Sequence, residues 1–386
     1  MKKKERDPYW DIIKGIGILS IVIGHIVATG TLHNFVYTYH LAIFYFVAIY
    51  FYDEKKYGDK PYKYFGSRLR GVWFKFVAYC WIVIFFHNFF ARHNFFTGIP
   101  PHGINEYLVE FLNTLLLKHS ELFLSAVWFI STLVIANGIF AVIMFVARRI
   151  SKAFSNNNKI KYLAIITATI ICGITGVYLT ANQLELEYHS HTVFLIMPLC
   201  VLGYFYKIFI TKNNFSEKFS KWYIALPISI ITASFLVFIA KKGLQIELAK
   251  GLIINGYMFY IVTTIGIVFC LSLAQLLVKI PIVKNVFSIL GKHSFAIMAF
   301  HFVAIKSVDV IYSYFINETR PKIIGKWITS YPDKLFFVYL LAATIGPVVF
   351  SIIFDFINEK VQDKITELDN KRKVKKLTNG KKEEAH

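Results

Sequence analysis

Residues 10–29, WDIIKGIGILSIVIGHIVAT, form a largely apolar stretch near the start of the chain that indicates the fold class. A helix needs about 20 such residues to span the hydrocarbon core of a bilayer, and this stretch has that length. Nine further stretches of similar length and character follow, at residues 34–52, 69–90, 122–147, 160–180, 192–210, 222–240, 251–278, 285–305 and 335–357. We therefore predict an all-α integral membrane protein, a bundle of about ten transmembrane helices.

The composition of the whole chain supports this prediction. Of 386 residues, 56% are hydrophobic and 17% are charged, whereas a soluble domain is about 45–50% apolar and about 25% charged. These two percentages exclude a soluble globule. A disordered chain is also excluded, because the chain is rich in apolar residues that form no low-complexity repeat. Since no linker divides the chain, we expect one transmembrane domain over residues 1–358, followed by a charged cytoplasmic tail over residues 359–386.

The net charge of +20 is explained by the position of the basic residues along the chain. If the N-terminus is cytoplasmic, 31 of the 43 Lys and Arg residues fall on the inner side, 10 fall on the outer side and two lie within spans. This bias obeys the positive-inside rule with both termini cytoplasmic. We therefore expect a multi-pass protein of the plasma membrane whose basic surface contacts lipid headgroups, and we exclude nucleic acid as a partner.

Three ionisable residues, Asp11, Lys14 and His25, lie in the first span, where the membrane disfavours charge. At 100° per residue, His25 lies about 20° from Lys14 and Asp11 about 60° to its other side, so one helical stripe carries all three. The rise from Lys14 to His25 is about 16 Å. A snorkelling lysine and a structural histidine would explain each residue alone, but three aligned ionisable residues favour a functional stripe.

The same span carries a face of small residues beside that stripe. Gly17, Ser20 and Gly24 follow one another at close to helical spacing. Small side chains allow a neighbouring helix to approach closely, and we expect such a helix there.

The motif DIIKGIGILSIVIGH resembles the first helix of the membrane-bound acyltransferase-3 family, near its branch of sugar O-acetyltransferases. In that family a basic residue precedes a histidine with ten residues between them, and Lys14 and His25 match this pattern. Four later segments are also similar to family motifs, although the second span lacks the usual Pro and Ser-Gly, and the basic motif reads RxR. They are TYHLAIFYFVAIYF with His40, SRLRGVWF with Arg68 and Arg70, AVWFISTL with Trp128, and LGKHSFAIMAFH with Ser294 and His301.

The resemblance implies a membrane O-acetyltransferase. The family moves an acyl group, generally acetyl from cytoplasmic acetyl-CoA, onto an extracytoplasmic acceptor such as a cell-surface polysaccharide or another glycan of the cell envelope. Acetyl-CoA is therefore the expected acyl donor and a glycan the expected acceptor. The acceptor hydroxyl, an acyl group other than acetyl and the oligomeric state are left open.

The predicted topology places the catalytic candidates at two depths. His25, His40 and His301 can lie in one layer toward the outer leaflet, and Trp128 can reach the same layer. His25 would take the proton of the acceptor hydroxyl or carry the acetyl group transiently, and the sequence leaves both roles open. For His40 and His301 the alternative is a structural hydrogen bond, and for Trp128 it is packing.

The second group of candidates lies at the cytoplasmic rim. Lys14 and Arg70 would bind coenzyme phosphates with support from Arg68, and Asp11 would pair with Lys14 and orient it. The alternative for Arg68 and Arg70 is a role as positive-inside anchors alone.

The rival function is a permease or flippase that exports a glycan or a lipid-linked precursor along the same charged stripe. Transporters of this kind often contain inverted repeats, and none is visible in the sequence.

No metal site is predicted, because the spacing of the external His189 and His191 does not by itself indicate a zinc site. Four other histidines lie in or near the external segment 91–121, where EYLVEFLNTLLLK has the pattern of an amphipathic interfacial helix. They are His87, His93, His102 and His119.

Overall fold

The protein is an all-helical bundle in the computed structural model, which describes residues 7–93, 95, 99–118, 121–210, 219–253, 256–316 and 329–383. These residues contain no strand. The helices are α1 (Pro8–Val27), α2 (Gly30–Tyr37), α3 (Ala42–Tyr50), α4 (Glu54–Tyr57), α5 (Pro61–Phe85), α6 (His87–Arg92), α7 (Ile104–Leu115), η1 (Leu122–Val127), α8 (Trp128–Ala153), α9 (Asn158–Ala181), η2 (Glu187–His189), α10 (Ser190–Phe205), η3 (Tyr206–Ile210), α12 (Trp222–Lys241), η4 (Leu248–Lys250), α13 (Gly256–Leu277), α14 (Pro281–Lys292), α15 (Ser294–Phe315) and α16 (Pro332–Glu383).

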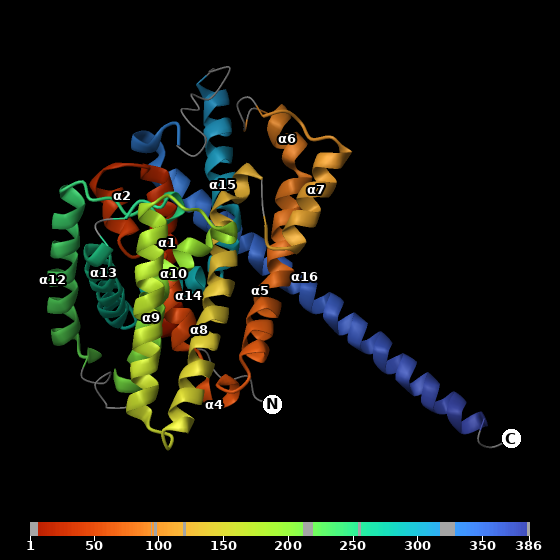
Figure 1. Cartoon of the computed structure of the whole chain (residues 1–386). Helices are drawn as coiled ribbons and strands as arrows, with labels where there is room; N and C mark the ends of the chain where they lie inside the picture. The colour runs from red at the N-terminus through yellow and green to blue at the C-terminus, as the bar shows by residue number, and fades with distance from the viewer. Residues whose placement is uncertain are drawn as a thin grey trace.

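Ten helical segments of the described chain are long and apolar enough to cross a membrane, which confirms the predicted fold class. Some spans combine two elements: α2 with α3, α5 with α6, and η1 with α8. The long helices stand side by side in Figure 1, and α16 extends away from the bundle toward the C-terminus. Residues 359–383, expected as a separate tail, continue α16 as helix.

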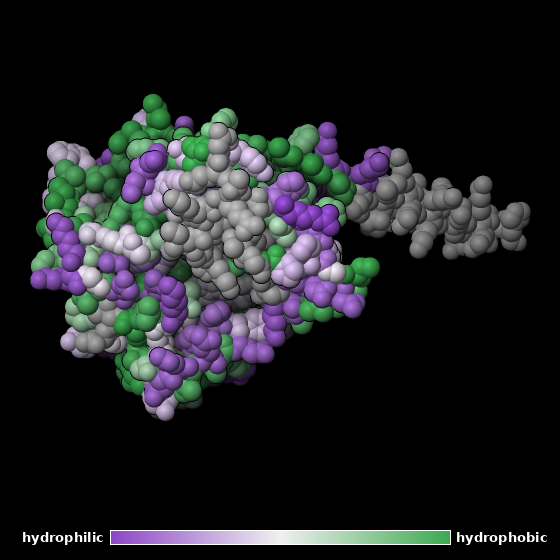
Figure 2. All heavy atoms as spheres, turned by 90° about the horizontal axis from the view of Figure 1, so that it is seen from above, coloured by the Kyte–Doolittle hydropathy of each residue, from purple (hydrophilic) through white to green (hydrophobic). Residues whose placement is uncertain are grey.

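The lateral surface of the bundle is apolar. Large hydrophobic side chains of α9 and α12 point outward, among them Ile170, Ile174, Ile230 and Ile231. Figure 2 shows the end of the bundle that lies at the top of Figure 1, where hydrophilic side chains gather over much of the face. An apolar belt between polar ends is the surface that a bilayer requires.

Helix α1 lies at the centre of the bundle and contacts α2, α3, α13, α14, α15 and α16. It begins at Pro8, whose missing N–H costs nothing at the first helical position, and the Asp7 carboxylate accepts a hydrogen bond from Tyr9 N at 3.0 Å. It ends where Ala28 adopts the left-handed conformation, with φ 53°. Because other helices surround α1, its ionisable stripe faces protein rather than lipid.

The closest helix contact of α1 is with α14 and depends on two glycines. A Cβ atom at Gly291 would lie 1.7 Å from the carbonyl oxygen of Asp11, and one at Gly15 would lie 2.2 Å from the carbonyl oxygen of Phe287. No side chain fits at either distance, so the two backbones touch directly.

The predicted face of small residues is in contact with the second span. A Cβ atom at Gly17 would lie 2.8 Å from the Phe44 ring, and one at Gly24 would lie 2.5 Å from the Tyr37 ring. Ser20 Oγ lies 3.1 Å from the hydroxyl of Tyr39. The expected close approach of another helix is therefore confirmed.

The ninth predicted span, residues 285–305, was placed wrongly. Its first part belongs to α14, which begins at Pro281 and ends at Lys292, and α15 then runs to Phe315. The apolar pattern ends before Lys306, but the helix continues because Lys306 Nζ lies 2.8 Å from Asp309 Oδ2 and each charge compensates the other. Both residues, which the sequence placed in an external segment, are buried in the helix.

The external helix predicted within residues 91–121 is present as α7 (Ile104–Leu115), and it packs along α5. The Trp73 indole N–H donates to the Leu115 carbonyl at 3.0 Å, and the Trp81 indole N–H donates to Thr114 Oγ1 at 2.7 Å. These contacts, from Trp73 and Trp81, attach the C-terminal end of α7 to the second half of α5. His119 lies outside the described residues.

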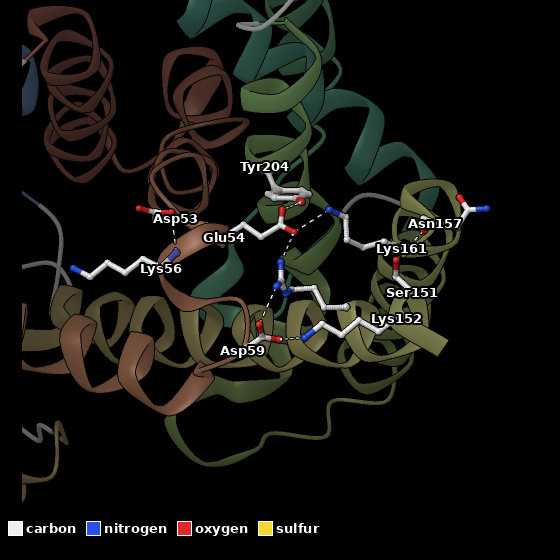
Figure 3. A network of polar contacts seen from close by, with 10 residues as sticks. Asp53, Glu54, Lys56, Asp59, Ser151, Lys152, Asn157, Lys161 and Tyr204 are labelled. Carbon is white, nitrogen blue, oxygen red and sulfur yellow. Dashed lines mark hydrogen bonds and ion pairs between the residues drawn. The ribbon is translucent and has the colours of Figure 1, made fainter. Parts of the chain in front are cut away.

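A network of charged groups ties α4 to three long helices at the end of the bundle where α1 begins (Figure 3). Glu54 accepts hydrogen bonds from Arg148 at 3.0 Å, Lys161 at 2.9 Å and the Tyr204 hydroxyl at 2.6 Å. Arg148 also donates to Asp59 at 2.9 Å. Burial alone would raise the pKa of Glu54, but the bonds from Tyr204, Lys161 and Arg148 outweigh it and lower that pKa from its ordinary value.

Candidate active site

A cavity of about 770 Å³ lies at the end of the bundle where α1 and α15 begin and α3 ends. This volume is typical of pockets that bind small molecules and cofactors. Three charged residues, Asp7, Asp11 and Lys14, line it together with mainly apolar side chains: Trp10, Phe44, Val47, Ala48, Tyr50, Phe51, Val72, Phe129, Ile130, Leu133, Ser294, Phe295 and Met298. The cavity therefore offers a long apolar wall with a small polar cluster on α1.

The polar cluster contains the predicted ion pair. Lys14 Nζ lies 2.6 Å from Asp11 Oδ1, one helical turn earlier, and both side chains are mostly buried. A pair of this length fixes the lysine side chain along α1 and aims its ammonium group at the cavity.

His25 and His301 form a stacked pair of imidazoles deeper in the bundle. Their ring centroids are 5.1 Å apart and their planes differ by 30°. Phe302 lies against both rings, at 4.6 Å from His25 and 4.2 Å from His301. The structure thus joins the histidine of the first span to that of the ninth, as the predicted common depth requires.

The two rings differ in what holds them. His301 is fully buried, and its Nδ1 lies 2.9 Å from the Ile297 carbonyl oxygen and 3.0 Å from that of Met298. Because a carbonyl oxygen only accepts, Nδ1 carries the proton, and Nε2 of the neutral ring has a lone pair. That Nε2 is buried and has no hydrogen-bond partner in the described chain.

His25 is less constrained. The residue is only partly buried. None of the hydrogen bonds among the described residues involves its ring. The pair therefore combines an imidazole without a fixing hydrogen bond and one whose tautomer is fixed, an arrangement suited to taking up and holding a proton.

His40 belongs to a second layer rather than to the stacked pair. Its Nδ1 donates to the Val36 carbonyl at 3.1 Å. The Tyr37 ring lies 4.3 Å from His40 and 6.5 Å from His25, so it contacts both imidazoles. Tyr37 also stacks on His33 at 3.9 Å. Among the ring contacts of the described residues, the predicted third imidazole thus meets His25 through the Tyr37 ring.

The cavity ends just short of the imidazole pair. Met298 is a lining residue, and His301 follows it by three residues on α15, a rise of about 4.5 Å. Neither imidazole belongs to the lining, and Lys14 and His25 are separated by about 16 Å along α1. Lys14 and His25 therefore mark two levels along α1. The polar cluster lies at the first level, and at the second His25 meets His301 of α15, with apolar side chains between the two levels.

A family model of an acyltransferase domain matches residues 7–356, which include every element of the cavity and of the imidazole pair. The chain belongs to the acyltransferase-3 family. It is therefore a multi-pass membrane acyltransferase, as the motif resemblance predicted. Comparisons with curated proteins and with solved structures give no match.

Two of the predicted coenzyme contacts of this acyltransferase lie away from the cavity lining. Arg68 stacks over the Tyr64 ring at 4.9 Å, and Arg70 Nε donates to the Gly66 carbonyl of its own helix at 3.1 Å. Helix α5 reaches the cavity through Val72 instead. Arg68 lies one helical turn before Val72 on nearly the same face of α5, and Arg70 lies on the opposite face, but neither arginine is among the described residues that line the cavity.

The last predicted site residue, Trp128, begins α8 and is buried. Its ring lies 5.1 Å from that of His189 and 6.4 Å from that of Phe129. Within the described residues it makes no ring contact with His25, His40 or His301, and Phe129 lines the cavity in its place. The expected wall of the imidazole layer is therefore formed by Phe302 and Tyr37 rather than by Trp128.

A buried polar network that was not predicted from the sequence lies beside the residue that follows His25. Asp309 accepts hydrogen bonds from Lys306, Ser330 and the Tyr339 hydroxyl. The neighbouring Thr329 hydroxyl donates to the Ile26 carbonyl at 2.8 Å, directly after His25 in the chain. The sequence signal for this network was a Lys and an Asp three residues apart, just beyond an apolar run.

Proposed function

We propose that this acyltransferase moves an acetyl group from cytoplasmic acetyl-CoA to a hydroxyl of an extracytoplasmic cell-surface glycan at the plasma membrane. The observation that carries the proposal is the stacked pair of His25 and His301 beyond the far end of a deep apolar cavity. A donor that enters from the end where α1 begins would direct its acyl group toward imidazoles that an acceptor reaches from the other side.

The cavity lining suits the arm of the coenzyme better than its phosphates. Lys14 is the single cation among the described lining residues, and two carboxylates accompany it. The apolar wall fits an acyl-pantetheine arm, and Lys14, oriented by Asp11, would contact its polar end nearest the mouth. Arg68 and Arg70 fit the role of lipid-headgroup anchors, one of the two roles expected for them.

The chemistry requires a base for the acceptor hydroxyl. In the proposed step His25 takes the hydroxyl proton while the hydroxyl oxygen attacks the thioester carbon. A C–O bond forms, the C–S bond breaks, and the proton passes from His25 to the departing thiolate of coenzyme A. The neutral His301 ring, stacked 5.1 Å from His25, would stabilise protonated His25 as an aromatic ring stabilises a neighbouring cation.

Reconstituted vesicles with labelled acetyl-CoA on the side of the N-terminus test this proposal. The experiment follows release of free coenzyme A and transfer of label to cell-surface polysaccharide. Loss of a general base costs about 10²–10⁴-fold in rate, so we expect His25→Ala to lose activity on that scale and His301→Ala to lose it with little change in KM for acetyl-CoA. Lys14→Met should mainly raise that KM.

The matched control is His93→Ala, because His93 is exposed and lies outside the cavity and the imidazole pair. It should leave transfer unchanged. Near-normal acetyl transfer by His25→Ala would remove the proposed mechanism. Glycan export that persists without any consumption of acetyl-CoA would instead support a permease, which has no use for the thioester.

A further inference from the structure

A second cluster of titratable side chains, separate from the imidazole pair, lies where α5 ends and α6 begins. Two histidines and two glutamates converge there from four segments: His87 from α6, His102 from the following loop, Glu110 from α7 and Glu121 from the residue before η1. One ligand-type atom from each of His87, His102 and Glu121 lies within 4.8 Å of the others. The proposed acyl transfer uses none of these groups.

We propose that this cluster is a structural zinc site, with His87, His102 and Glu121 as ligands and Glu110 completing the tetrahedron. Imidazole and carboxylate are ligands that Zn²⁺ accepts in four-coordinate sites. His102 Nε2 already lies 3.3 Å from Glu110 Oε1, close to the spacing of about 3.3 Å between ligands of a tetrahedral zinc ion. No metal was predicted from the sequence, in which the histidines considered for zinc were His189 and His191.

His87 is held in the way that metal-bound histidines are held. Its Nε2 lies 3.2 Å from the Pro100 carbonyl oxygen, so this nitrogen carries a proton and donates it. The other nitrogen, Nδ1, makes a 2.6 Å hydrogen bond with Glu121 Oε2 inside the cluster, and a zinc ion would replace the proton of that bond. A histidine that ligates a metal commonly donates its other ring N–H to a backbone carbonyl, which fixes the ring and its tautomer.

His102 is positioned by Asn88, the residue that follows His87 in the chain. The Asn88 side chain accepts from the backbone N–H of His102 at 2.6 Å and donates to its carbonyl at 2.9 Å. This double clamp stacks the His102 ring on His87, with centroids 3.4 Å apart and planes 19° apart. The two imidazoles are therefore stacked face to face, so one ring must turn about its side-chain bonds before both can direct an in-plane nitrogen lone pair at one ion.

Two buried atoms of the cluster have unused bonding capacity. Glu121 is 2% exposed, and its Oε1 has no hydrogen-bond partner within the described residues. The buried Nε2 of His102 faces Glu110 Oε1 at 3.3 Å but makes no hydrogen bond of good geometry within the described residues. A buried carboxylate oxygen without a partner is costly, and a cation in the cluster would satisfy it.

One Zn²⁺ would supply two positive charges beside the two carboxylates of the cluster, Glu110 and Glu121. The ion would tie α6 and α7 to η1, which packs against α15, the helix of His301.

The test measures metal content and is independent of acyl transfer. The full chain is purified in detergent with an affinity tag that contains no histidine, and zinc is determined by mass spectrometry. We expect about one zinc per chain, and a loss of at least about tenfold in zinc content for the double variant His102→Ala/Glu121→Gln. The matched control, His93→Ala/Glu106→Gln, changes exposed residues of the same types in the same segment and should keep its zinc.

A measurement on the unaltered chain guards against a variant that fails to fold. After treatment with a chelator, the chain is titrated with Co²⁺, whose visible absorption band is intense only in four-coordinate sites. Appearance of that band, and its loss on addition of Zn²⁺, would support the site. The proposal is overturned if the unaltered chain binds neither ion, or if the cluster variant retains as much zinc as the control.

Discussion

Substitution of Gly291 by Ala probes the contact that holds α14 against α1. The new Cβ would lie 1.7 Å from the Asp11 carbonyl oxygen, 2.7 Å from the carbonyl carbon and 2.9 Å from Gly15 N. A carbon–oxygen contact needs about 3.3 Å, so the two helices must separate by about 1.6 Å at this point. Both obstacles are backbone, which no side-chain rotation can relieve. We expect a destabilisation of about 3 kcal/mol, the upper end for one added methylene in a packed core.

The displaced atom belongs to Asp11, so the substitution should also disturb the cavity. A shift of the Asp11 backbone moves the partner that orients Lys14. The assay is thermal unfolding in detergent, combined with KM and kcat for acetyl-CoA consumption. We expect the unfolding midpoint to fall by several degrees, with a rise in KM that exceeds the fall in kcat.

Gly71→Ala is the control for this experiment. Gly71 lies in α5 with no atom within 4 Å of its added Cβ, so the exchange removes only the flexibility of glycine. It should be neutral or stabilise by up to about 1 kcal/mol. If Gly291→Ala unfolds at the same temperature as Gly71→Ala, the direct backbone contact between α1 and α14 is refuted.

Three further substitutions, two of them with a comparison variant, test other parts of the molecule. The pKa of Glu54 in the folded chain lies below its ordinary value of 4.5, so Glu54 stabilises the fold above pH 4.5 and loses this effect as the pH falls through the lower folded value. Glu54→Gln should therefore unfold at a lower temperature near pH 7 and show a flatter acid limb than the wild type in a pH series of melting curves. Lys306→Met should destabilise by about 3 kcal/mol in chemical unfolding, because it leaves Asp309 buried without its ammonium partner. Lys75→Met, which breaks a half-exposed pair with Asp355, should cost at most about 1 kcal/mol, and equal losses would contradict this argument. Met298→Trp should narrow the far end of the cavity and lower acetyl transfer at least about tenfold, whereas Ile282→Trp on the exposed face of α14 should not.

The number and class of the spans could be predicted because they depend on local chemistry alone. Stretches of about 20 apolar residues are visible in any bilayer-spanning helix, and the α1 stripe follows from the angle per residue. The failure at the ninth span has the same origin. Lys306 and Asp309 end the apolar pattern, but their mutual compensation is a three-dimensional fact that hydropathy does not contain.

The arrangement of the candidate site was predicted only where one helix determined it. The pairing of Asp11 with Lys14 follows from their positions on α1. The stacking of His25 on His301 joins helices 276 residues apart, and only the depth of each residue was accessible from the sequence. Arg68 and Arg70 were expected beside Lys14, yet packing decides which side chains of α5 line the cavity, and among the described residues Val72 does so.

The central position of α1 connects its glycines to its chemistry. Lys14 lines the cavity at one level and His25 joins the imidazole pair about 16 Å further along, so a single straight helix sets the distance between the two. That distance is useful only if α1 cannot rotate. Gly15 against α14 and Gly17 and Gly24 against the second span fix the helix from opposite neighbours, at contacts where a methyl group would already collide. The glycines of the motif therefore support the roles of its lysine and histidine, because they keep the side chains of Lys14 and His25 turned toward the interior of the bundle.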